Sequence, residues 1–241
     1  MSGHNKWSQI KRQKAVTDQK RGSLFTKLAK AIAVATKQGG KDPTTNFKLR
    51  LATEKAKTAN MPNDNIERAI KRGSGELEGA TIEEIVYEGY GPGGIALIIS
   101  SATDNKNRTS SNIKRILSKY NGNLGGSGSV AWMFDTKGVI RVLKDAINDK
   151  EKFELKVIDA GAEDIAEEEE GYIIYTRIND LPKLKTIVEK EGIKIASSEI
   201  EMVPHDLIEI KEGSDKKKML HLLEELELDD DVNNFFTNAN L

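Results

Sequence analysis

The run Ile85-Val86-Tyr87-Glu88-Gly89-Tyr90-Gly91-Pro92-Gly93-Gly94-Ile95-Ala96-Leu97-Ile98-Ile99 places two β-rich segments on either side of a glycine-rich turn. Isoleucine, valine and tyrosine are enriched in strands, and glycine is the residue that most readily adopts the positive φ of a tight reversal. The run therefore predicts an antiparallel β-hairpin.

Residues 89–94 also satisfy the letters of the dinucleotide-binding fingerprint G-x-G-x-x-G. That fingerprint requires a helix to open directly after the glycines, so that its free amides meet the pyrophosphate. A β-rich apolar run follows here instead, and a turn explains the glycines better. The chain also lacks a G-x-x-x-x-G-K-[ST] loop, so nucleotide hydrolysis of that type is not supported.

Two α+β regions follow from the residues after the hairpin. Ile113, Ile116 and Leu117 mark an amphipathic helix that ends at Gly122, and a strand is predicted over 130–134, which makes a ββαβ unit. A second series, βαββαβ, has the order of a ferredoxin-like split unit. Its strands are expected at 138–143, 172–178 and 193–203 and its helices near 153–160 and 183–191, with an acidic stretch to residue 170 between them.

The last residues carry another strand candidate at 207–210, a helix over 216–226 and a short segment around Phe235-Phe236. The ββαβ unit lacks a closing helix and strand. We therefore expect the carboxyl-terminal residues to return and complete it, with the βαββαβ unit inserted between.

The residues before the hairpin have helical periodicity. Three helices are expected: one with Ser23 as a plausible cap and an end at Gly39-Gly40, a second from Phe47 to about Ala56, and a third that begins with Pro62 and stops at Gly73. Residues 73–79 form a glycine-rich, acidic linker.

The predicted fold class is α+β, with a helical bundle followed by two α+β domains, the third inserted into the second. The expected domains are a basic helical domain at 1–76, a split α+β domain at 77–136 and 205–241, and an inserted ferredoxin-like domain at 137–204.

The charge of the chain is sorted along its length. Residues 1–72 carry 17 Lys and Arg against 5 Asp and Glu, whereas the remainder carries 20 against 33. The net charge of −1 is therefore the sum of a strongly positive amino-terminal region and a strongly negative remainder. Lysine and arginine that neutralise phosphates release counterions, which gives affinity for nucleic acid of any sequence. A well-solvated helical surface is the alternative interpretation.

Composition excludes several classes of protein. There is no cysteine, so disulfides, thiolate nucleophiles and Cys-ligated metals are excluded, and His4, His205 and His221 are too dispersed to suggest a metal site. The amino-terminal residues lack a secretory signal, and no apolar run is long enough to span a bilayer, so we expect a cytoplasmic location and no membrane partner. No cofactor or small-molecule substrate is evident.

The candidate nucleic-acid contacts lie mostly in the amino-terminal region, where residues 1–21 have few apolar side chains to bury. Trp7 either stacks on a base or anchors this arm. Lys106 and Arg108 belong to a polar segment, 103–109, that joins a strand to a helix start and would suit a phosphate or carboxylate; capping by Asn107 or Thr109 is the alternative. The predicted contacts are Lys6, Trp7, Lys11, Arg12, Lys14, Lys20, Arg21, Lys71, Arg72, Lys106 and Arg108.

Catalysis has little support. The acidic run from Glu163 to Glu170 is the only candidate for divalent cations, and hence for a metal-dependent nuclease. Adjacent carboxylates in a strand point to opposite faces, which disfavours convergent ligation, so a solvated hairpin is expected there. No base and nucleophile are brought together by the sequence, so no catalytic residue is assigned and the chain is not expected to be an enzyme.

Several long motifs, in order, resemble the YebC/PmpR family. They are Met1-Ser2-Gly3-His4-Asn5-Lys6-Trp7-Ser8-Gln9-Ile10-Lys11, Lys37-Gln38-Gly39-Gly40-Lys41-Asp42-Pro43, Asn60-Met61-Pro62-Asn63-Asp64-Asn65-Ile66-Glu67-Arg68-Ala69-Ile70, Tyr87-Glu88-Gly89-Tyr90-Gly91-Pro92-Gly93-Gly94 and Thr103-Asp104-Asn105-Lys106-Asn107-Arg108-Thr109, with a further match over 125–134. The family includes mitochondrial translational activators of cytochrome oxidase.

The resemblance implies a helical domain and two ferredoxin-like domains, the third inserted into the second. It also implies a cytoplasmic regulator of gene expression, commonly described as a DNA-binding regulator of transcription. Some members instead resemble ribosome-associated factors that assist translation. Our prediction is a non-enzymatic nucleic-acid binder whose partner is DNA, with ribosomal RNA or the ribosome as the alternative, because lysine meets the phosphates of both in the same way.

Overall fold

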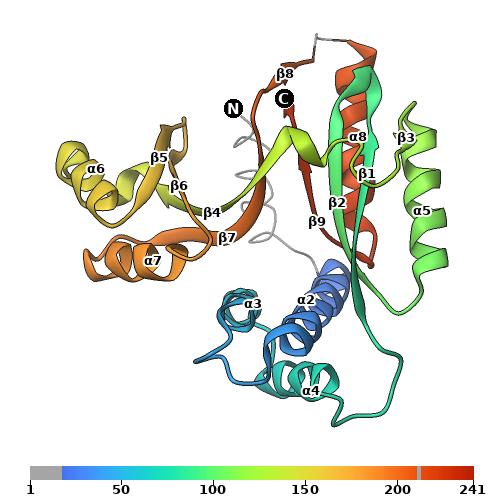
Figure 1. The fold of residues 1–241 in the computed structure, drawn as a ribbon, viewed down its shortest axis with the longest axis horizontal. Coiled ribbons are helices and arrows are strands. Elements are labelled where there is room, and N and C mark those ends of the chain that lie inside the picture. Colours follow the sequence, from blue (N-terminus) through green and yellow to red (C-terminus); the bar gives the residue numbers. More distant parts are fainter. Residues whose placement is uncertain (1–17, 211–212) are drawn as a thin grey trace.

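The computed structural model describes residues 18–210 and 213–241 of the chain, with side chains from Arg21 onward in the first range (Figure 1). The predicted contacts at Lys6, Trp7, Lys11, Arg12 and Lys14 therefore lie outside the described residues, and so does the side chain of Lys20.

The amino-terminal part is the predicted three-helix unit. Its helices are α2 (Asp18–Gly39), α3 (Phe47–Thr58) and α4 (Asn63–Gly73). Apolar side chains at three- and four-residue spacing form their shared core, which includes Leu28, Ile32, Leu49, Ala56 and Ile66.

The turn between α2 and α3 is closed by the buried Asn46. Its side chain caps α3 by accepting a hydrogen bond from the amide of Leu49, and its Nδ2 donates to the carbonyls of Ala35 at 2.8 Å and Gly40 at 2.7 Å. The expected cap at Ser23 is wrong, because α2 begins five residues earlier and Ser23 lies inside it. There its hydroxyl is free to bond elsewhere, and it donates to Asp230 at 2.5 Å.

The predicted hairpin is confirmed. Strands β1 (Glu83–Tyr90) and β2 (Ala96–Thr103) pair in antiparallel register, joined by the short 3-10 turn η1 (Pro92–Gly94), where Gly93 and Gly94 have φ of 70° and 76°. Among the described residues this sheet has the order β3-β1-β2-β9, with β3 at Asn123–Leu124 and β9 at Val232–Thr237. Because β9 pairs with β2, the carboxyl-terminal residues do return to this sheet, as expected.

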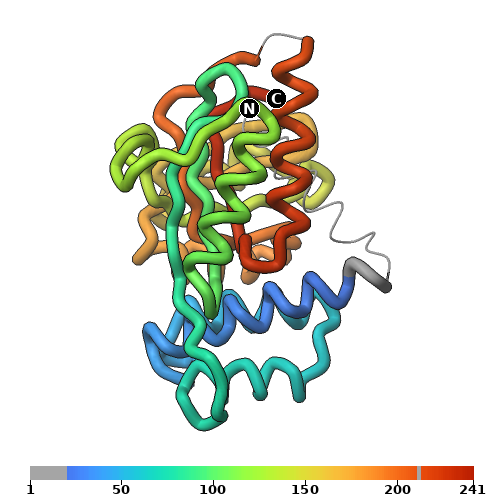
Figure 2. Tube along the Cα trace, turned by 90° about the vertical axis from the view of Figure 1, so that its right-hand side faces the viewer, coloured from blue at the N-terminus to red at the C-terminus, as the bar shows by residue number. Residues whose placement is uncertain are grey.

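One face of this first sheet is covered by α5 (Lys106–Lys119) and α8 (Ser214–Leu228), which lie side by side in Figure 2. Leu97 and Ile99 of β2 pack against Ile113 and Leu117 of α5 and Leu222 of α8, all almost fully buried. The strand candidate at 207–210 forms only a two-residue strand, β8 (Ile208–Glu209), which pairs in parallel with β10 (Ala239–Asn240).

The predicted strand at 130–134 is wrong. Residues Ala131–Met133 form a 3-10 turn, η2, and the chain enters β4 only at Phe134. The physical reason is the buried carboxylate of Glu88, which accepts hydrogen bonds from the amides of Gly128, Val130 and Ala131 at 2.7, 2.8 and 2.8 Å. These amides are therefore not available to a strand ladder.

The third part is the predicted βαββαβ unit. Its strands are β4 (Phe134–Leu143), β5 (Ala162–Glu167), β6 (Gly171–Thr176) and β7 (Ile195–Pro204), and its helices are α6 (Lys150–Asp159) and α7 (Leu181–Lys190), with the short 3-10 turn η3 (Lys144–Ala146) after β4. The antiparallel sheet has the order β5-β6-β4-β7. Strand β6 lies between β4 and β5, which α6 connects, and β4 lies between β6 and β7, which α7 connects. This is the expected split βαβ arrangement.

The helical unit lies against both sheet units (Figure 1). Ala33 and Val34 of α2 form a buried cluster with Ile82 and Ala102 of the first sheet unit, whereas α3 packs against the core of the second. Strands β4 and β7 are long and lead from one sheet unit into the other. The residue boundaries of the three domains stay a prediction.

Candidate nucleic-acid interface

Four cations gather where α2 and α4 end, and we call them the α2–α4 cationic cluster: Lys37, Lys41, Lys71 and Arg72, all exposed. The two helix ends lie close together, because an added Cβ on Gly73 would sit 2.4 Å from the carbonyl oxygen of Ala33. Cations at helix carboxyl ends also offset the negative end of the helix dipole, so the local sequence has a structural reason for them.

Part of this cluster is already engaged. Lys41 forms an exposed ion pair with Glu76 at 2.8 Å, which raises the pKa of Lys41, and Arg72 donates to the carbonyl of Ala80 at 3.4 Å. Within the described ranges, no carboxylate oxygen lies within 4 Å of the ammonium groups of Lys37 and Lys71. The structure thus brings predicted Lys71 and Arg72 together with Lys37, which the sequence reasoning did not single out.

Predicted Lys106 and Arg108 lie at the start of α5, and both meet carboxylates of the chain itself. Lys106 pairs with Glu83 at 2.6 Å. Arg108 donates to Asp104 at 3.0 Å and to Asp231 at 3.0 Å. The helix cap is Asn105, which accepts from the amide of Arg108 at 3.1 Å, so the suggested caps Asn107 and Thr109 are wrong.

Asp231 occupies the position where a phosphate or carboxylate was expected. Its Oδ2 accepts from the Thr109 hydroxyl at 2.7 Å, and its Oδ1 accepts from Lys30 of α2 at 2.6 Å. Burial by itself would raise the pKa of Asp231, but the bonds from Lys30, Thr109 and Arg108 outweigh it and lower that pKa to about 2. Within the described residues the anion beside Arg108 is therefore a carboxylate of the chain itself, and contact of this segment with a phosphate stays a prediction.

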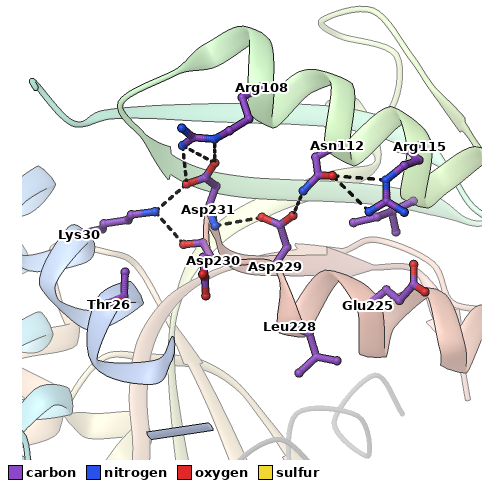
Figure 3. Close-up of a pocket in the computed structure, with 11 residues that line it drawn as sticks. Thr26, Lys30, Arg108, Asn112, Arg115, Glu225, Leu228, Asp229, Asp230 and Asp231 are labelled. Carbon is purple, nitrogen blue, oxygen red and sulfur yellow. Dashed lines mark hydrogen bonds and ion pairs between the residues drawn. The ribbon is translucent and has the colours of Figure 1, made fainter. Parts of the chain in front are cut away.

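A cavity of about 590 Å³ lies beside this carboxylate, between α2, α5 and the end of α8 (Figure 3). Both signs of charge line it, with three cations from α2 and α5 and four acids from α8 and the residues that follow it. The lining residues are Thr26, Lys30, Arg108, Asn112, Arg115, Ile116, Glu225, Leu228, Asp229, Asp230 and Asp231.

The glycine-rich loop after β3 presents an aromatic side chain that sequence reasoning missed. Trp132 is 68% exposed, and its indole N–H donates to the carbonyl of Ser129 at 3.2 Å, which also accepts from the Tyr90 hydroxyl at 3.0 Å. With Glu88 holding the neighbouring amides, the indole is carried on a loop fixed by several hydrogen bonds. In the sequence, a tryptophan shortly after a Gly-Ser-Gly-Ser stretch was the signal that could have indicated an exposed aromatic side chain on a loop.

The acidic run at 163–170 forms the expected hairpin of β5 and β6. Glu167 pairs with Lys144 and Lys150, both at 2.6 Å, and these bonds lower its pKa to about 2, while Glu163 pairs with Arg177 at 3.1 Å. Across 18–210 and 213–241, no group of three or more His, Asp or Glu side chains is arranged to hold a metal ion.

No helix in the described part of the chain combines the length and the apolar character needed to cross a bilayer.

These features define a class of protein with a cation-rich three-helix unit and two antiparallel sheets, each covered by two helices, one sheet unit inserted into the other. Family models match nearly the whole chain: the TACO1/YebC protein N-terminal domain at residues 5–76, and the TACO1/YebC second and third domain at residues 82–239. The chain belongs to the TACO1/YebC family.

Individual relatives agree with this assignment. A probable transcriptional regulatory protein of Chlorobaculum tepidum is 51% identical over 242 residues, which covers 100% of this chain and 96% of that protein. One of Syntrophomonas wolfei is 50% identical over 243 residues, covering 100% and 97%. The crystal structure of a conserved hypothetical protein from Aquifex aeolicus matches with a TM-score of 0.85 at 44% identity, covering 94% of this chain and 93% of that one. The curated names are those of transcriptional regulators, not of enzymes.

Proposed function

We propose that this protein is a non-enzymatic regulator of gene expression that binds nucleic acid through its amino-terminal region, with DNA as the partner. The observation that carries the proposal is the sorting of charge, with 17 cationic and 5 acidic residues over 1–72 in a chain of net charge −1. Segregated lysine and arginine supply the electrostatic term that dominates affinity for phosphate backbones.

The helical unit supports the proposal with exposed cations. Lys37, Lys57, Arg68 and Lys71 are all exposed, and no carboxylate among the described residues lies within 4 Å of them. An exposed cation with no carboxylate within 4 Å gives up no close ion pair when it binds a phosphate. The names of the relatives, which are transcriptional regulators, favour DNA.

We assign the principal contacts to Lys6, Lys11, Arg12, Lys14, Lys20 and Arg21, with Lys71 and Arg72 in support. Trp7 either stacks on a base or anchors the arm. Lys106 and Arg108 are secondary contacts, because each would have to exchange an ion pair for a phosphate.

One observation favours RNA, and with it the ribosome, as a second candidate. Trp132 is exposed outside the helical unit and its N–H is already bonded, so its ring faces are what it offers to a partner. Aromatic rings stack on unpaired bases, which RNA loops present far more often than duplex DNA.

The test is the affinity of the full chain, by fluorescence anisotropy, for a 20-base-pair DNA duplex and for single-stranded RNA at several salt concentrations. If about six phosphates are neutralised, log K falls against log salt with a slope of about −5 on duplex DNA and about −4 on single strands. A slope near zero on both would refute the proposal.

Paired variants locate the contacts. Lys11→Ala with Lys14→Ala, and Lys71→Ala with Arg72→Ala, should each weaken binding about equally on all sequences, because phosphate contacts carry little base information. The control is Lys183→Ala with Lys190→Ala on α7, which removes the same charge from exposed positions without an ion pair in the described structure. Cosedimentation with ribosomes, without retention of genomic DNA, would instead support a function in translation.

A further inference from the structure

The segment 105–134 differs from the rest of the chain after residue 72. It contains five Lys and Arg and no Asp or Glu, although the chain beyond residue 72 is acidic as a whole. All five cations lie on the 14-residue helix α5. A helix of mixed charge is normally expected on a solvated surface, so the complete lack of carboxylates on α5 calls for a reason.

Three of the five cations are held by carboxylates from other elements. Lys106 pairs with Glu83. Arg108 pairs with Asp231, and Lys119 pairs with Glu225. These three residues fasten α5 to β1, to the start of β9 and to α8, so their charges are already balanced within the molecule.

Lys114 and Arg115 are different. Both are exposed, and in the described part of the chain no carboxylate lies within 4 Å of either cationic group. The helix positions three and four residues away from them on the exposed side are Ser111, Ser118 and Lys119. On α7, by contrast, Lys185 has Glu189 one turn along the helix at 3.5 Å.

The guanidinium of Arg115 is also held in place. The Oδ1 of Asn112 accepts from its Nε at 3.4 Å and from its Nη2 at 3.2 Å, and the Nδ2 of Asn112 donates to Asp229 at 2.5 Å. Figure 3 shows this chain of side chains at the edge of the cavity. A guanidinium has five N–H donors, so Arg115 keeps three for a ligand, and its planar shape suits two oxygens of one phosphate.

The acids of the cavity have donors of their own. Asp229 also accepts from the amide of Asp231 at 2.9 Å, and Glu225 accepts from Lys119 and from the hydroxyl of Tyr120 at 3.0 Å. Asp230 accepts from the Ser23 hydroxyl. Their negative charge is therefore partly compensated inside the molecule. Arg115 also lowers the pKa of Glu225 by charge attraction, but it forms no ion pair with Glu225 within 4 Å.

We propose that the exposed side of α5, centred on Lys114 and Arg115 and flanked by the hydroxyls of Ser111 and Ser118, is a second phosphate-contacting surface for nucleic acid. This inference rests on the proposed function and adds to it a contact outside the amino-terminal domain. Thr26 and Lys30 of α2 line the same cavity as Arg115, so the middle of α2 and this surface are neighbours.

The experiment compares Lys114→Ala with Arg115→Ala, made together, against the Lys183→Ala and Lys190→Ala control in the full chain. Binding of the labelled 20-base-pair duplex and of single-stranded RNA is measured between about 50 and 300 mM salt. If the α5 variant loses two phosphate contacts, the slope of log K against log salt on the duplex becomes about 1.8 less steep. At about 0.1 M salt this corresponds to a Kd increase of up to about 60-fold. Thermal unfolding of each variant confirms that the fold is intact.

A second measurement uses the unaltered protein. Lys114 should be protected from acetylation when saturating nucleic acid is added, whereas Lys183 should react equally with and without it. Arg115→Lys should keep most of the salt slope and weaken binding, because it retains the charge and loses the two-pronged donor geometry.

The outcomes separate the two proposals. Salt-dependent binding by the wild type, with the α5 variant equal to the control and Lys114 unprotected, overturns the α5 surface and leaves the proposed function standing. Salt-independent binding by the wild type overturns both. A reduced slope together with protection of Lys114 supports both.

Discussion

Lys30 and Asp231, 201 residues apart in the chain, form an ion pair of 2.6 Å in which the side chains are only 17% and 10% exposed. Lys30 belongs to the helical unit, and Asp231 immediately precedes β9 of the first sheet. Because Asp231 also binds Thr109 and Arg108 of α5, one carboxylate joins three elements. It therefore adds a charged contact to the apolar cluster through which α2 packs against the first sheet unit.

Replacing Asp231 with Asn should lower the free energy of unfolding by about 2 kcal/mol, because Lys30 and Arg108 would lose a largely buried charged partner. Urea denaturation at pH 7 checks this. Asp145→Asn, an exposed position without an ion pair in the described structure, is the control. Equal midpoints for the two variants would contradict the role given to Asp231.

The same carboxylate predicts a pH dependence. Its pKa in the folded protein is about 2, below the ordinary value of 3.8, so its stabilisation is complete above about pH 5 and is lost as the pH falls towards 2. We expect a contribution of about 1–2 kcal/mol after solvent screening. Asp231→Asn should flatten the acid limb of the stability profile, and an unchanged limb would show that other carboxylates control it.

Glu88→Gln should destabilise the protein by about 2 kcal/mol, because an amide that carries its own donors replaces a carboxylate that accepts from three backbone amides. Burial would raise the pKa of Glu88, but these amides lower it overall, so its stabilisation is present above its unfolded pKa and is lost on acidification. The exposed Glu169→Gln is the matched control. Fluorescence of Trp132 should respond to the first substitution alone.

Arg141 and Glu201 form a buried, two-pronged ion pair across β4 and β7, with Nη1–Oε1 and Nη2–Oε2 distances of 2.5 and 2.9 Å and exposures of 3% and 7%. Glu201→Gln removes the carboxylate that binds the buried guanidinium and should cost about 3–5 kcal/mol. The double change Arg141→Met with Glu201→Leu should recover most of that loss. A double-mutant cycle by chemical denaturation measures it, and additive effects of the two single changes would refute the coupling.

Lys27 should have an unusually low pKa for a lysine. Its burial lowers its pKa to about 8, despite nearby Asp229, Glu227 and Asp230, and its ammonium donates to the carbonyl of Glu227 at 2.5 Å. Since the folded state releases this proton before the unfolded state does, stability should rise as the pH increases from about 8 to 10.5. Lys27→Met should abolish that rise in melting experiments, whereas Lys37→Met, at an exposed position, should preserve it.

The parts of the fold that local sequence controls were predictable. The hairpin around residues 89–94, the three amino-terminal helices and the βαββαβ order follow from apolar periodicity and turn residues. The return of the carboxyl-terminal strand was inferred because the first sheet unit lacked a closing helix and strand. The first features depend on residues that are neighbours in sequence. The return of the carboxyl-terminal strand depends on the number and order of helices and strands, which the sequence also shows.

The errors arose where a distant residue controls the outcome. The strand expected at 130–134 is replaced by a 3-10 turn because Glu88, 42 residues before Val130, takes the backbone donors. At the candidate site, sequence placed Arg108 beside an anion but could not show that the anion is Asp231, 123 residues away. It likewise did not show that Lys114 and Arg115 are exposed.

The sequence by itself determined the local elements and the separation of charge, because backbone preference, apolar spacing and residue type are properties of short segments. Only the tertiary structure decided which cations stay open to a partner. Lys30 and Arg108 are neutralised through contacts with a distant aspartate, whereas Lys71 and Lys114 have no carboxylate within 4 Å among the described residues. Coulomb attraction depends on distance in space, and folding alone sets which opposite charges come within reach of each other.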